Sequence, residues 1–260
     1  MEACFLAGNL NHCIKTKRMM KTYISTLLLS LLLTVSAHSQ IKLKLPKIFS
    51  KDTTSKVTES EAGQGIKEAL TQGVTNAVLN LNKTDGFFGS EAYKLFLPPD
   101  AKKIETTLRN IGMGAQVDKA ILSINRGAED AVGYAKPIFV DAIKQMTITD
   151  ALNIIKGPKD AATQYFKQKT TQKLIEAFTP SVKGSLDKVD ATKYYGDIVN
   201  TDNKLPTTFK KINPDLTSFV VGKAVDALFD QVAKEEANIR ANPVARTTDI
   251  LKKVFGSAIK

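Results

Sequence analysis

The sequence predicts an all-α protein: a single multi-helix domain of about eight to ten helices that follows a cleaved signal peptide. Three observations lead to this prediction. Apolar residues recur at a helical period along nearly the whole chain after residue 57. No segment has the convincing alternation of a strand, and no heptad array or internal repeat is present. The roughly 200 residues of this region can bury a sizeable core.

Residues 20–39, "MKTYISTLLLSLLLTVSAHS", have the pattern of a secretory signal. Lys21 provides the positive start, an apolar run extends from Ile24 to Val35, and Ala37-His38-Ser39 has small residues at the cleavage-site positions. The apolar run is too short to span a bilayer of roughly 30 Å comfortably. We therefore expect cleavage after Ser39, no transmembrane anchor afterwards, and a periplasmic or secreted protein.

No folded structure is predicted for the segments on either side of this signal. Residues 1–19 precede a plausible start at Met19 or Met20, so we interpret them as a dubious leader. Residues 40–57 are rich in Lys, Ser and Thr, and we expect a flexible basic lead-in there. The helical domain is expected to occupy residues 58–260.

Removal of the signal would remove all the cysteine and histidine of the chain. Cys4, Cys13, His12 and His38 all precede Gln40, and the chain has no Trp. A disulfide framework, a thiolate nucleophile, a Ser-His-Asp triad and His or Cys metal sites are thereby excluded from the mature protein. No metal and no cofactor are expected.

The mature chain is basic. The leader and signal contain four basic residues and one acidic residue, so the net charge falls from +11 to +8 when they are removed. A basic exported protein meets anionic lipid or an acidic envelope polymer before it meets nucleic acid. Because positive and negative residues are interspersed, an ordinary solvated surface is the alternative interpretation.

The first predicted helix has an apolar stripe from Ile66 to Leu81 and about 24 residues. It should stop at Thr84-Asp85-Gly86, before a loop whose aromatic residues enter the core. A short helix should begin at Pro98-Pro99-Asp100 and end at Gly112 and Gly114. The stripe from Val117 to Met146 keeps its phase through Pro137, which predicts one kinked helix or two nearly coaxial ones.

Caps and prolines divide the remaining chain. Thr149-Asp150 should cap a short helix that ends at Gly157-Pro158, with Pro158 in the first turn of the next helix. Each Asn-Pro or Thr-Pro pair places a capping side chain before a proline, so each should begin a new helix. These pairs are Thr179-Pro180, Asn213-Pro214 and Asn242-Pro243. Gly256 should close the last helix.

Several stretches resemble one bacterial family. "SINRGAEDAVGYAKPIF", "MTITDAL", "AATQYF" and "EEANIRANPVARTTDILKKVFG" are similar to domain-of-unknown-function family 4197, over roughly Glu61 to Gly256. The resemblance implies an exported bacterial protein but no activity, cofactor or catalytic residue. Gly127 departs from the family pattern, which favours alanine there. The motif positions are Asn125, Ala128, Glu129, Pro137, Met146, Asp150, Gly157, Thr163, Tyr165, Glu236, Arg240, Pro243, Arg246 and Thr247.

Polar residues in these motifs are candidates for a polar interior. Asn125 and Glu129 lie one turn apart beside an alanine-rich stripe, where they could line a pocket or form a hydrogen-bonded pair between helices. Arg126 and Asp130 should form an i, i+4 pair on the outer side. The other candidates for interior polar positions are Asp150, Tyr165 and Glu236.

The best candidate ligand site is an anion site near the C-terminus. Glu236 and Arg240 form an i, i+4 pair, and Arg246, Thr247 and Thr248 open the last predicted helix. A helix N-terminus flanked by two arginines can bind phosphate or carboxylate. The alternative is that Arg240 and Arg246 hold the last two helices together through carboxylates.

The stretch from Met146 to Phe166 has the outline of a helix-turn-helix, but the start of its second helix lacks base-reading side chains. We expect two packed helices, with Thr163 and Tyr165 hydrogen-bonded to neighbours, and no nucleic-acid partner. Catalysis by carboxylates alone, as in glycoside cleavage, would recruit residues from one set. This set is Glu129, Asp130, Asp150 and Glu236.

The sequence favours a non-enzymatic envelope protein that binds an anionic or amphipathic ligand or has a structural role. The alternatives are a carboxylate-dependent hydrolase of an envelope polymer and a scaffold for another exported protein. Either an internal apolar cavity or an open groove with two carboxylates would discriminate between the first two classes.

Overall fold

The described helices are arranged around two long ones, α7 and α9. The structure is a computed structural model that describes residues 58–206, 210–242, Asp249 and Lys252. The described residues belong to one compact unit, Ser55–Lys260, and they are all-α, with no strand among them. The elements are α2 (Glu59–Asn82), a 3-10 turn η1 (Pro99–Ala101), α3 (Lys102–Asn110), α4 (Gly114–Val132), α5 (Ala135–Gln145), α6 (Ile148–Lys156), α7 (Ala161–Asp187), α8 (Ala191–Asp202) and α9 (Leu216–Ala241).

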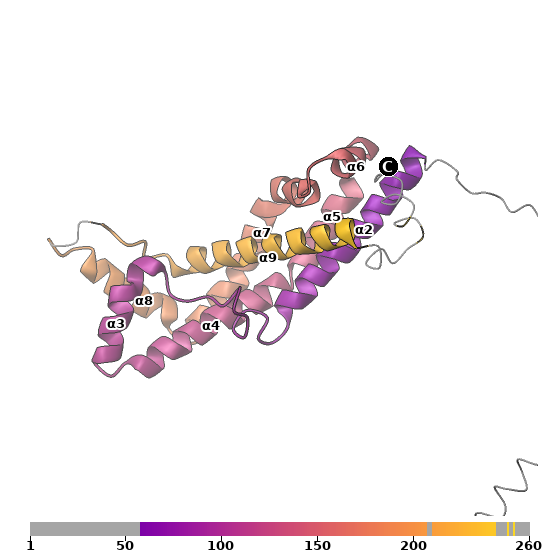
Figure 1. Ribbon diagram of the computed structural model, residues 1–260. Coiled ribbons are helices and arrows are strands. Elements are labelled where there is room, and N and C mark those ends of the chain that lie inside the picture. The colour runs from indigo at the N-terminus through magenta and orange to yellow at the C-terminus, as the bar shows by residue number, and fades with distance from the viewer. Residues whose placement is uncertain (1–57, 207–209, 243–248, 250–251, 253–260) are drawn as a thin grey trace, which may run out of the picture. The chain divides into compact units, whose positions relative to one another are not determined.

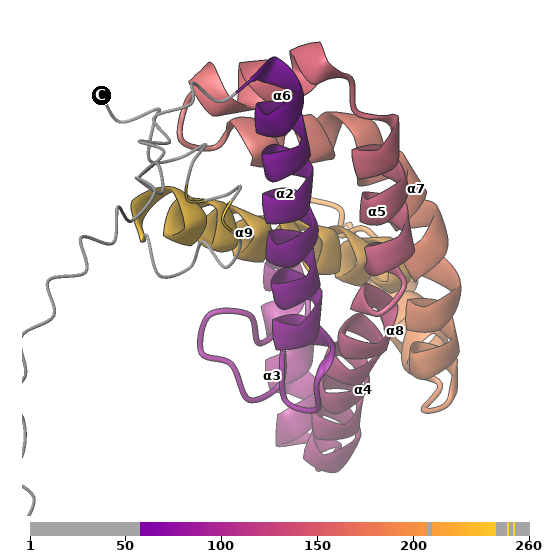
Figure 2. The same ribbon diagram turned by 90° about the vertical axis from the view of Figure 1, so that its right-hand side faces the viewer.

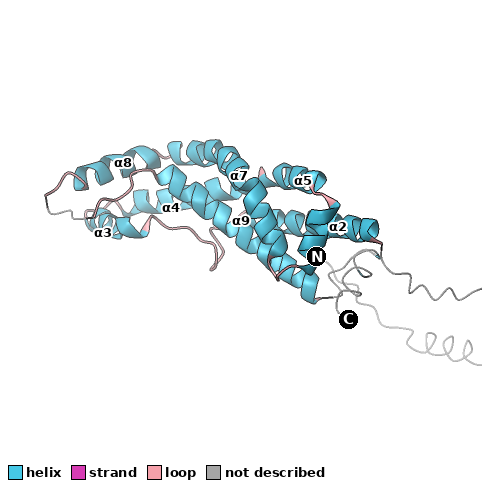
Figure 3. Ribbon diagram, turned by 90° about the horizontal axis from the view of Figure 1, so that it is seen from above, coloured by secondary structure: helices cyan, strands magenta, loops and turns pink. Residues whose placement is uncertain are grey.

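Helix α9 packs against α2, α4 and α7, and α7 also packs against α4 and α5 (Figures 1 and 2). Helices α3 and α8 lie at one end of this unit, and α6 lies towards the other end, beside α2 (Figures 1 and 3). None of the described helices is both long and apolar enough to cross a membrane.

Aromatic rings fill the centre of the core. Phe139 of α5 packs edge to face on Phe166 of α7, with 5.0 Å between ring centroids, and lies 6.2 Å from the ring of Phe229 on α9. Phe87 is fully buried, as expected for the loop after the first helix, whereas Phe96 of the same loop is 57% exposed. Edge-to-face pairs of this kind add about 0.5–1.5 kcal/mol each to the burial of the rings.

Helices α4 and α7 approach each other closely at Gly127. A Cβ atom at this position would lie 3.0 Å from the Cβ atom of Ser185 and 3.4 Å from the Cα atom of Val182. The Ser123 hydroxyl on the same side of α4 donates to the Ser185 carbonyl. The departure at Gly127 from the family pattern therefore lies at a packing position.

The predicted first helix is confirmed with its 24 residues, Glu59–Asn82. The long stripe that contains Pro137 forms two helices, α4 and α5, which are separated at Gly133 and Tyr134. Pro137 has no N–H to close a turn on the Gly133 carbonyl, and it occupies the third position of α5, where that donor is not needed.

Two predicted boundaries are wrong. Thr179-Pro180 does not start a helix: Pro180 lies inside α7, which continues to Asp187. Phe178 and Val182 are fully buried on either side of the proline, so burial of this face outweighs the lost backbone bond. Helix α7 also begins at Ala161, three residues after Pro158.

The cap of α6 differs from the predicted one. Thr147, not Thr149, is the N-cap residue, and Asp150 is the third residue of a capping box with it. Helix α9 begins two residues after Pro214, because Asp215 is its N-cap and Asn213 accepts a hydrogen bond from the Asp215 N–H. The predicted break at Asn242 is present, since α9 ends at Ala241.

Four sequence predictions fall outside the described residues: the leader 1–19, the signal 20–39, the lead-in 40–57 and the helix closed by Gly256.

Replacing the proline inside α7 should stabilise the protein. Pro180 is exposed, so little packing is lost with its ring, and alanine would restore a donor for the Glu176 carbonyl. We expect Pro180→Ala to raise the free energy of unfolding by about 1–2 kcal/mol in urea denaturation. Pro214→Ala, in the loop before α9, is the matched control and should lower it by about 0.4–1 kcal/mol. A loss of stability in Pro180→Ala would contradict the explanation.

Candidate functional site

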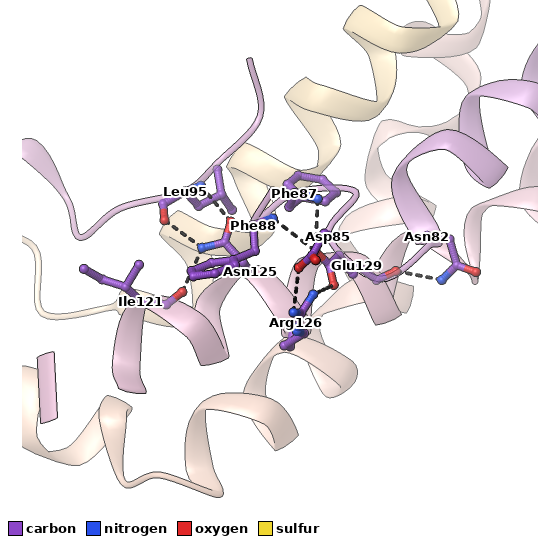
Figure 4. A network of polar contacts seen from close by, with 9 residues as sticks. All are labelled: Asn82, Asp85, Phe87, Phe88, Leu95, Ile121, Asn125, Arg126 and Glu129. Atoms are coloured by element: carbon purple, nitrogen blue, oxygen red, sulfur yellow. Dashed lines mark hydrogen bonds and ion pairs between the residues drawn. The ribbon is translucent and has the colours of Figure 1, made fainter. Parts of the chain in front are cut away.

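Asn125 fixes the loop between α2 and α3 on α4. Its side-chain oxygen accepts the Leu95 N–H at 2.8 Å, and its amide nitrogen donates to the Leu95 carbonyl at 2.8 Å (Figure 4). A second bond from the same nitrogen reaches the Ile121 carbonyl at 2.8 Å. Asn125 is fully buried and holds the backbone of an extended segment in the way that a neighbouring strand would.

Glu129 is one turn further along α4 and holds the same loop. Its Oε1 atom accepts the N–H groups of Phe87 and Phe88 at 3.0 and 3.1 Å (Figure 4). Its Oε2 atom pairs with the Arg126 guanidinium, which also binds Asp85 at 2.7 Å. The pair predicted between Arg126 and Asp130 is therefore replaced by Arg126 pairs with Glu129 and Asp85. The two polar residues join a helix to a loop rather than two helices.

Glu236 of α9 caps the first turn of α7. Its carboxylate accepts the N–H groups of Ala162 and Thr163 at 3.0 and 2.9 Å, and the Thr163 hydroxyl at 2.8 Å. The N-cap residue of α7, Asp160, makes no side-chain cap bond. A residue 73 positions away in the chain thus satisfies donors that the helix itself leaves open.

Arg240 is joined to this cap. Its guanidinium binds the Glu236 carboxylate at 2.7 Å and the Ile154 carbonyl of α6 at 2.9 Å. The predicted anion site also needs Arg246, Thr247 and Thr248, which lie outside the described residues. The arginine that is described therefore serves as a link between α6 and α9.

Asp150 and Tyr165 are half-buried. The N–H and hydroxyl groups of Thr147 donate to the Asp150 carboxylate and hold its pKa below the usual range. The Tyr165 hydroxyl donates to the Ala142 carbonyl at 3.1 Å, and burial, followed by the charge of Asp150, raises its pKa. Asp150 therefore caps its own helix, whereas Tyr165 joins α7 to α5. The hydrogen bonds expected for Thr163 and Tyr165 are both present.

The carboxylates considered for hydrolysis each bind different partners, in different parts of the unit. Glu129, Asp150 and Glu236 each accept backbone N–H groups on three different parts of the unit, and Asp130 is exposed. Within the described ranges, no three His, Cys, Asp or Glu side chains gather as they would around a metal ion. These contacts give each buried carboxylate a structural task.

The space beside Glu236 and Arg240 is small. Aliphatic side chains of α2, α6 and α9 surround a cavity of about 30 Å³. A cavity needs roughly 10–15 Å³ of such volume for one water molecule. It therefore has room for one or two waters and not for a lipid chain.

A much larger cleft lies between α3, the start of α4 and α8. Its volume is about 430 Å³, which is within the range of small-molecule sites. Its wall is mainly aliphatic and includes Ile104 and Leu108 from α3, Val117 and Ala120 from α4, Ile198 from α8 and Leu216 from α9. Helix α3 packs on α4, and α8 packs on α7 and α9, so these helices frame the cleft from opposite sides.

Polar groups are few in this cleft. Lys119 on α4 and Lys188 after α7 line it, together with Asp190 and Gln116. Asp190 is the N-cap residue of α8 in the left-handed conformation (φ 52°), and its side chain makes no cap bond. The lining charges sum to +1, and they lie on an otherwise apolar surface.

Two tyrosines of α8 complete the wall. Tyr194 is 55% exposed, and Tyr195 is 7% exposed. The Tyr195 hydroxyl donates to the Asn213 carbonyl at 3.2 Å, and burial, followed by the charge of Asp100, raises its pKa to about 12. Tyr195 is therefore uncharged at neutral pH and does not repel an anion.

The sequence did not predict this cleft. The predicted sites were sets of polar residues, whereas the cleft is built from apolar residues of separate helices. The available signal was the pair Tyr194 and Tyr195, which directly follows Lys193 in a segment with few other aromatics.

A family model described as Protein of unknown function (DUF4197) matches residues 56–256. This range contains all the helices of the described structure and confirms the resemblance drawn from the motifs. No curated protein and no solved structure matches the chain at a significant level.

Removal of the Asn125 amide should loosen the loop. Asn125→Ala leaves both backbone groups of Leu95 without these partners in a buried place, and we expect the free energy of unfolding to fall by roughly 2–4 kcal/mol. Urea denaturation measures this loss, and hydrogen exchange at the Leu95 amide should become faster. Asn200→Ala, exposed on α8, is the control and should change stability by less than about 0.5 kcal/mol. A loss below about 1 kcal/mol in Asn125→Ala would argue against this role.

Asp150 should contribute stability that depends on pH. Its pKa is lower in the folded state, so the contribution is present above the unfolded pKa of about 3.9 and is lost as pH falls through the folded value. Asp150→Asn should therefore reduce the free energy of unfolding at pH 7, and its difference from the wild type should shrink below about pH 4. Urea denaturation at pH 7, 5 and 3 measures both effects.

The control is Asp226→Asn on α9, an exposed position, which should change stability by less than about 0.5 kcal/mol at each pH. A pH-independent difference for Asp150→Asn would show that the charge of the capping box is not what stabilises α6.

Proposed function

We propose, for a chain that belongs to the DUF4197 family and inherits no activity from it, that the cleft between α3, α4 and α8 binds a single-chain amphiphile with an anionic head group. A fatty acid is the simplest ligand of this class. The observation that carries the proposal is the composition of the cleft, about 430 Å³ of mainly aliphatic wall with two lysines among its few polar groups.

The acyl chain would be held by burial of its methylene groups. Each methylene group removed from water contributes about 0.8 kcal/mol before the costs of association. The aliphatic side chains of α3, α4 and α9 supply this surface, and the hydroxyl of the buried Tyr195 is bonded to the Asn213 carbonyl. An apolar chain therefore suits the cleft better than a sugar or a nucleotide.

The head group would lie near Lys119 and Lys188. Lys188 is three residues before the first residue of α8, and the side chain of the N-cap residue Asp190 makes no cap bond to that turn. Positive charge and the N-terminal end of a helix both attract an anion, by about 0.3–1 kcal/mol each when exposed. The neighbouring Asp190 carboxylate opposes this attraction, so we expect the lysines to tune affinity and the apolar wall to provide most of it.

The place of binding would be the cell envelope. The pattern of residues 20–39 favours export with cleavage after Ser39. An exported protein of net charge +8 meets anionic lipid and free fatty acids there. We therefore infer a binding protein for amphiphiles in the periplasm or outside the cell.

Native mass spectrometry of the exported chain, produced in a bacterial host with its own N-terminus, is the first test. Added dodecanoate or hexadecanoate should give a one-to-one adduct, and the intact mass should equal residues 40–260. The chain has no Trp, so fluorescence of its tyrosines can report binding in a titration. A wild-type protein without any such adduct would contradict the proposed function.

Variants locate the site. Ala120→Phe places a ring in the cleft and should weaken binding at least tenfold, whereas Lys119→Glu with Lys188→Glu should weaken it about tenfold, mostly at low salt. Lys136→Glu with Lys144→Glu makes the same change of charge at two exposed positions of α5 and should leave binding unchanged. Equal affinity in Ala120→Phe, with the fold intact by circular dichroism, would exclude this cleft as the site.

A further inference from the structure

A second groove adjoins the cleft and is also lined by α3 and α8. Its volume is about 390 Å³, and its lining includes Thr107 of α3 and Thr201 and Leu205 at the end of α8. Three side chains line both spaces: Ile104 and Leu108 from α3, and Ile198 from α8. The cleft and the groove therefore adjoin at these three aliphatic residues.

Charges differ between the two spaces. The cleft has Lys119 and Lys188 with Asp190, whereas the groove has Asp197 and Asp202 with Lys103. The lining charges thus sum to +1 in the cleft and −1 in the groove. An anionic head group is attracted to the first and repelled by the second, so the uncharged end of a chain should point to the groove.

The shared side chains differ in how firmly they are held. Ile104 is 8% exposed and is part of the core, whereas Leu108 and Ile198 are half-buried and pack against its edge. A half-buried aliphatic side chain can change its rotamer at less cost than a core residue. Leu108 and Ile198 are therefore the two shared side chains that can move most easily.

We propose that Leu108 and Ile198 set the length of acyl chain that this protein binds, and that the groove receives the end of longer chains. This inference rests on the proposed function and adds which chain lengths the site prefers. The occupant of the groove is the same acyl chain, because the aliphatic wall is continuous between the two spaces and the acidic rim of the groove disfavours a second anionic head group. Shorter chains would occupy the cleft alone.

Saturated fatty acids of 8 to 18 carbons provide the test, with tyrosine fluorescence or calorimetry below the micelle concentration. Leu108→Ala and Ile198→Ala each remove part of the partition, that is, the side chains that separate the cleft from the groove. We expect each to improve the affinity for the longest chains relative to the shortest by at least fivefold. Leu108→Phe narrows the passage and should shift the ratio in the opposite direction by a similar factor.

Val189→Ala is the matched control. Val189 lines the cleft but not the groove, so its truncation should weaken all chain lengths by a similar factor and leave the ratio unchanged. Circular dichroism establishes that each variant is folded. A folded variant with an altered ratio supports the inference even when its overall affinity is lower.

The outcomes separate the two proposals. If the wild-type protein binds no fatty acid of any length, the proposed function fails and this inference fails with it. If the wild type binds fatty acids and Ala120→Phe weakens that binding, but Leu108→Ala, Ile198→Ala and Leu108→Phe keep the wild-type chain-length ratio, the proposed function stands and this inference is wrong. A change in ratio in Val189→Ala equal to that in Leu108→Ala would also overturn the inference.

Discussion

Burial of irregular backbone is the constraint on which the rest of this structure depends. The loop between α2 and α3 carries Phe87 into the core, and α7 begins beside α9 with no cap from its own N-cap residue. The N–H groups at these places are shielded from water, and an unpaired one costs about 1–3 kcal/mol. Asn125, Glu129 and Glu236 supply their acceptors. The loop and the start of α7 can be buried because these three side chains accept hydrogen bonds from their backbone N–H groups.

This constraint also explains why the polar motifs are poor candidates for chemistry. A carboxylate that holds two backbone N–H groups and an arginine, as Glu129 and Glu236 do, has its oxygens committed to the fold. The proposed ligand site lies elsewhere, where side chains of regular helices leave a space. Neither Glu129 nor Glu236 lines the cleft between α3, α4 and α8.

The sequence predicted the helices well and their long-range partners poorly. The 24-residue α2 and the division of the stripe around Pro137 into two helices follow from periodicity and proline chemistry, which are local. The continuation of α7 through Pro180 depends on burial of Phe178 and Val182 by other helices, which no local rule contains. In the same way, Glu236 was a candidate by its spacing to Arg240, but its bonds to Ala162 and Thr163 join residues more than 70 positions apart. The cleft arises from four helices together and has no motif.

The close approach at Gly127 has a mechanical consequence. The backbones of α4 and α7 are nearly in contact there, and the Ser123 hydroxyl donates a hydrogen bond from α4 to α7. We therefore expect the two helices to resist bending and sliding relative to each other. The wall of the cleft formed by α4 is therefore stiff. Helix α3 has one buried side chain, Ile104, and is followed by Gly112 in a left-handed conformation (φ 87°). If a bulky ligand enters the cleft, we expect α3 to move and the wall formed by α4 to keep its position.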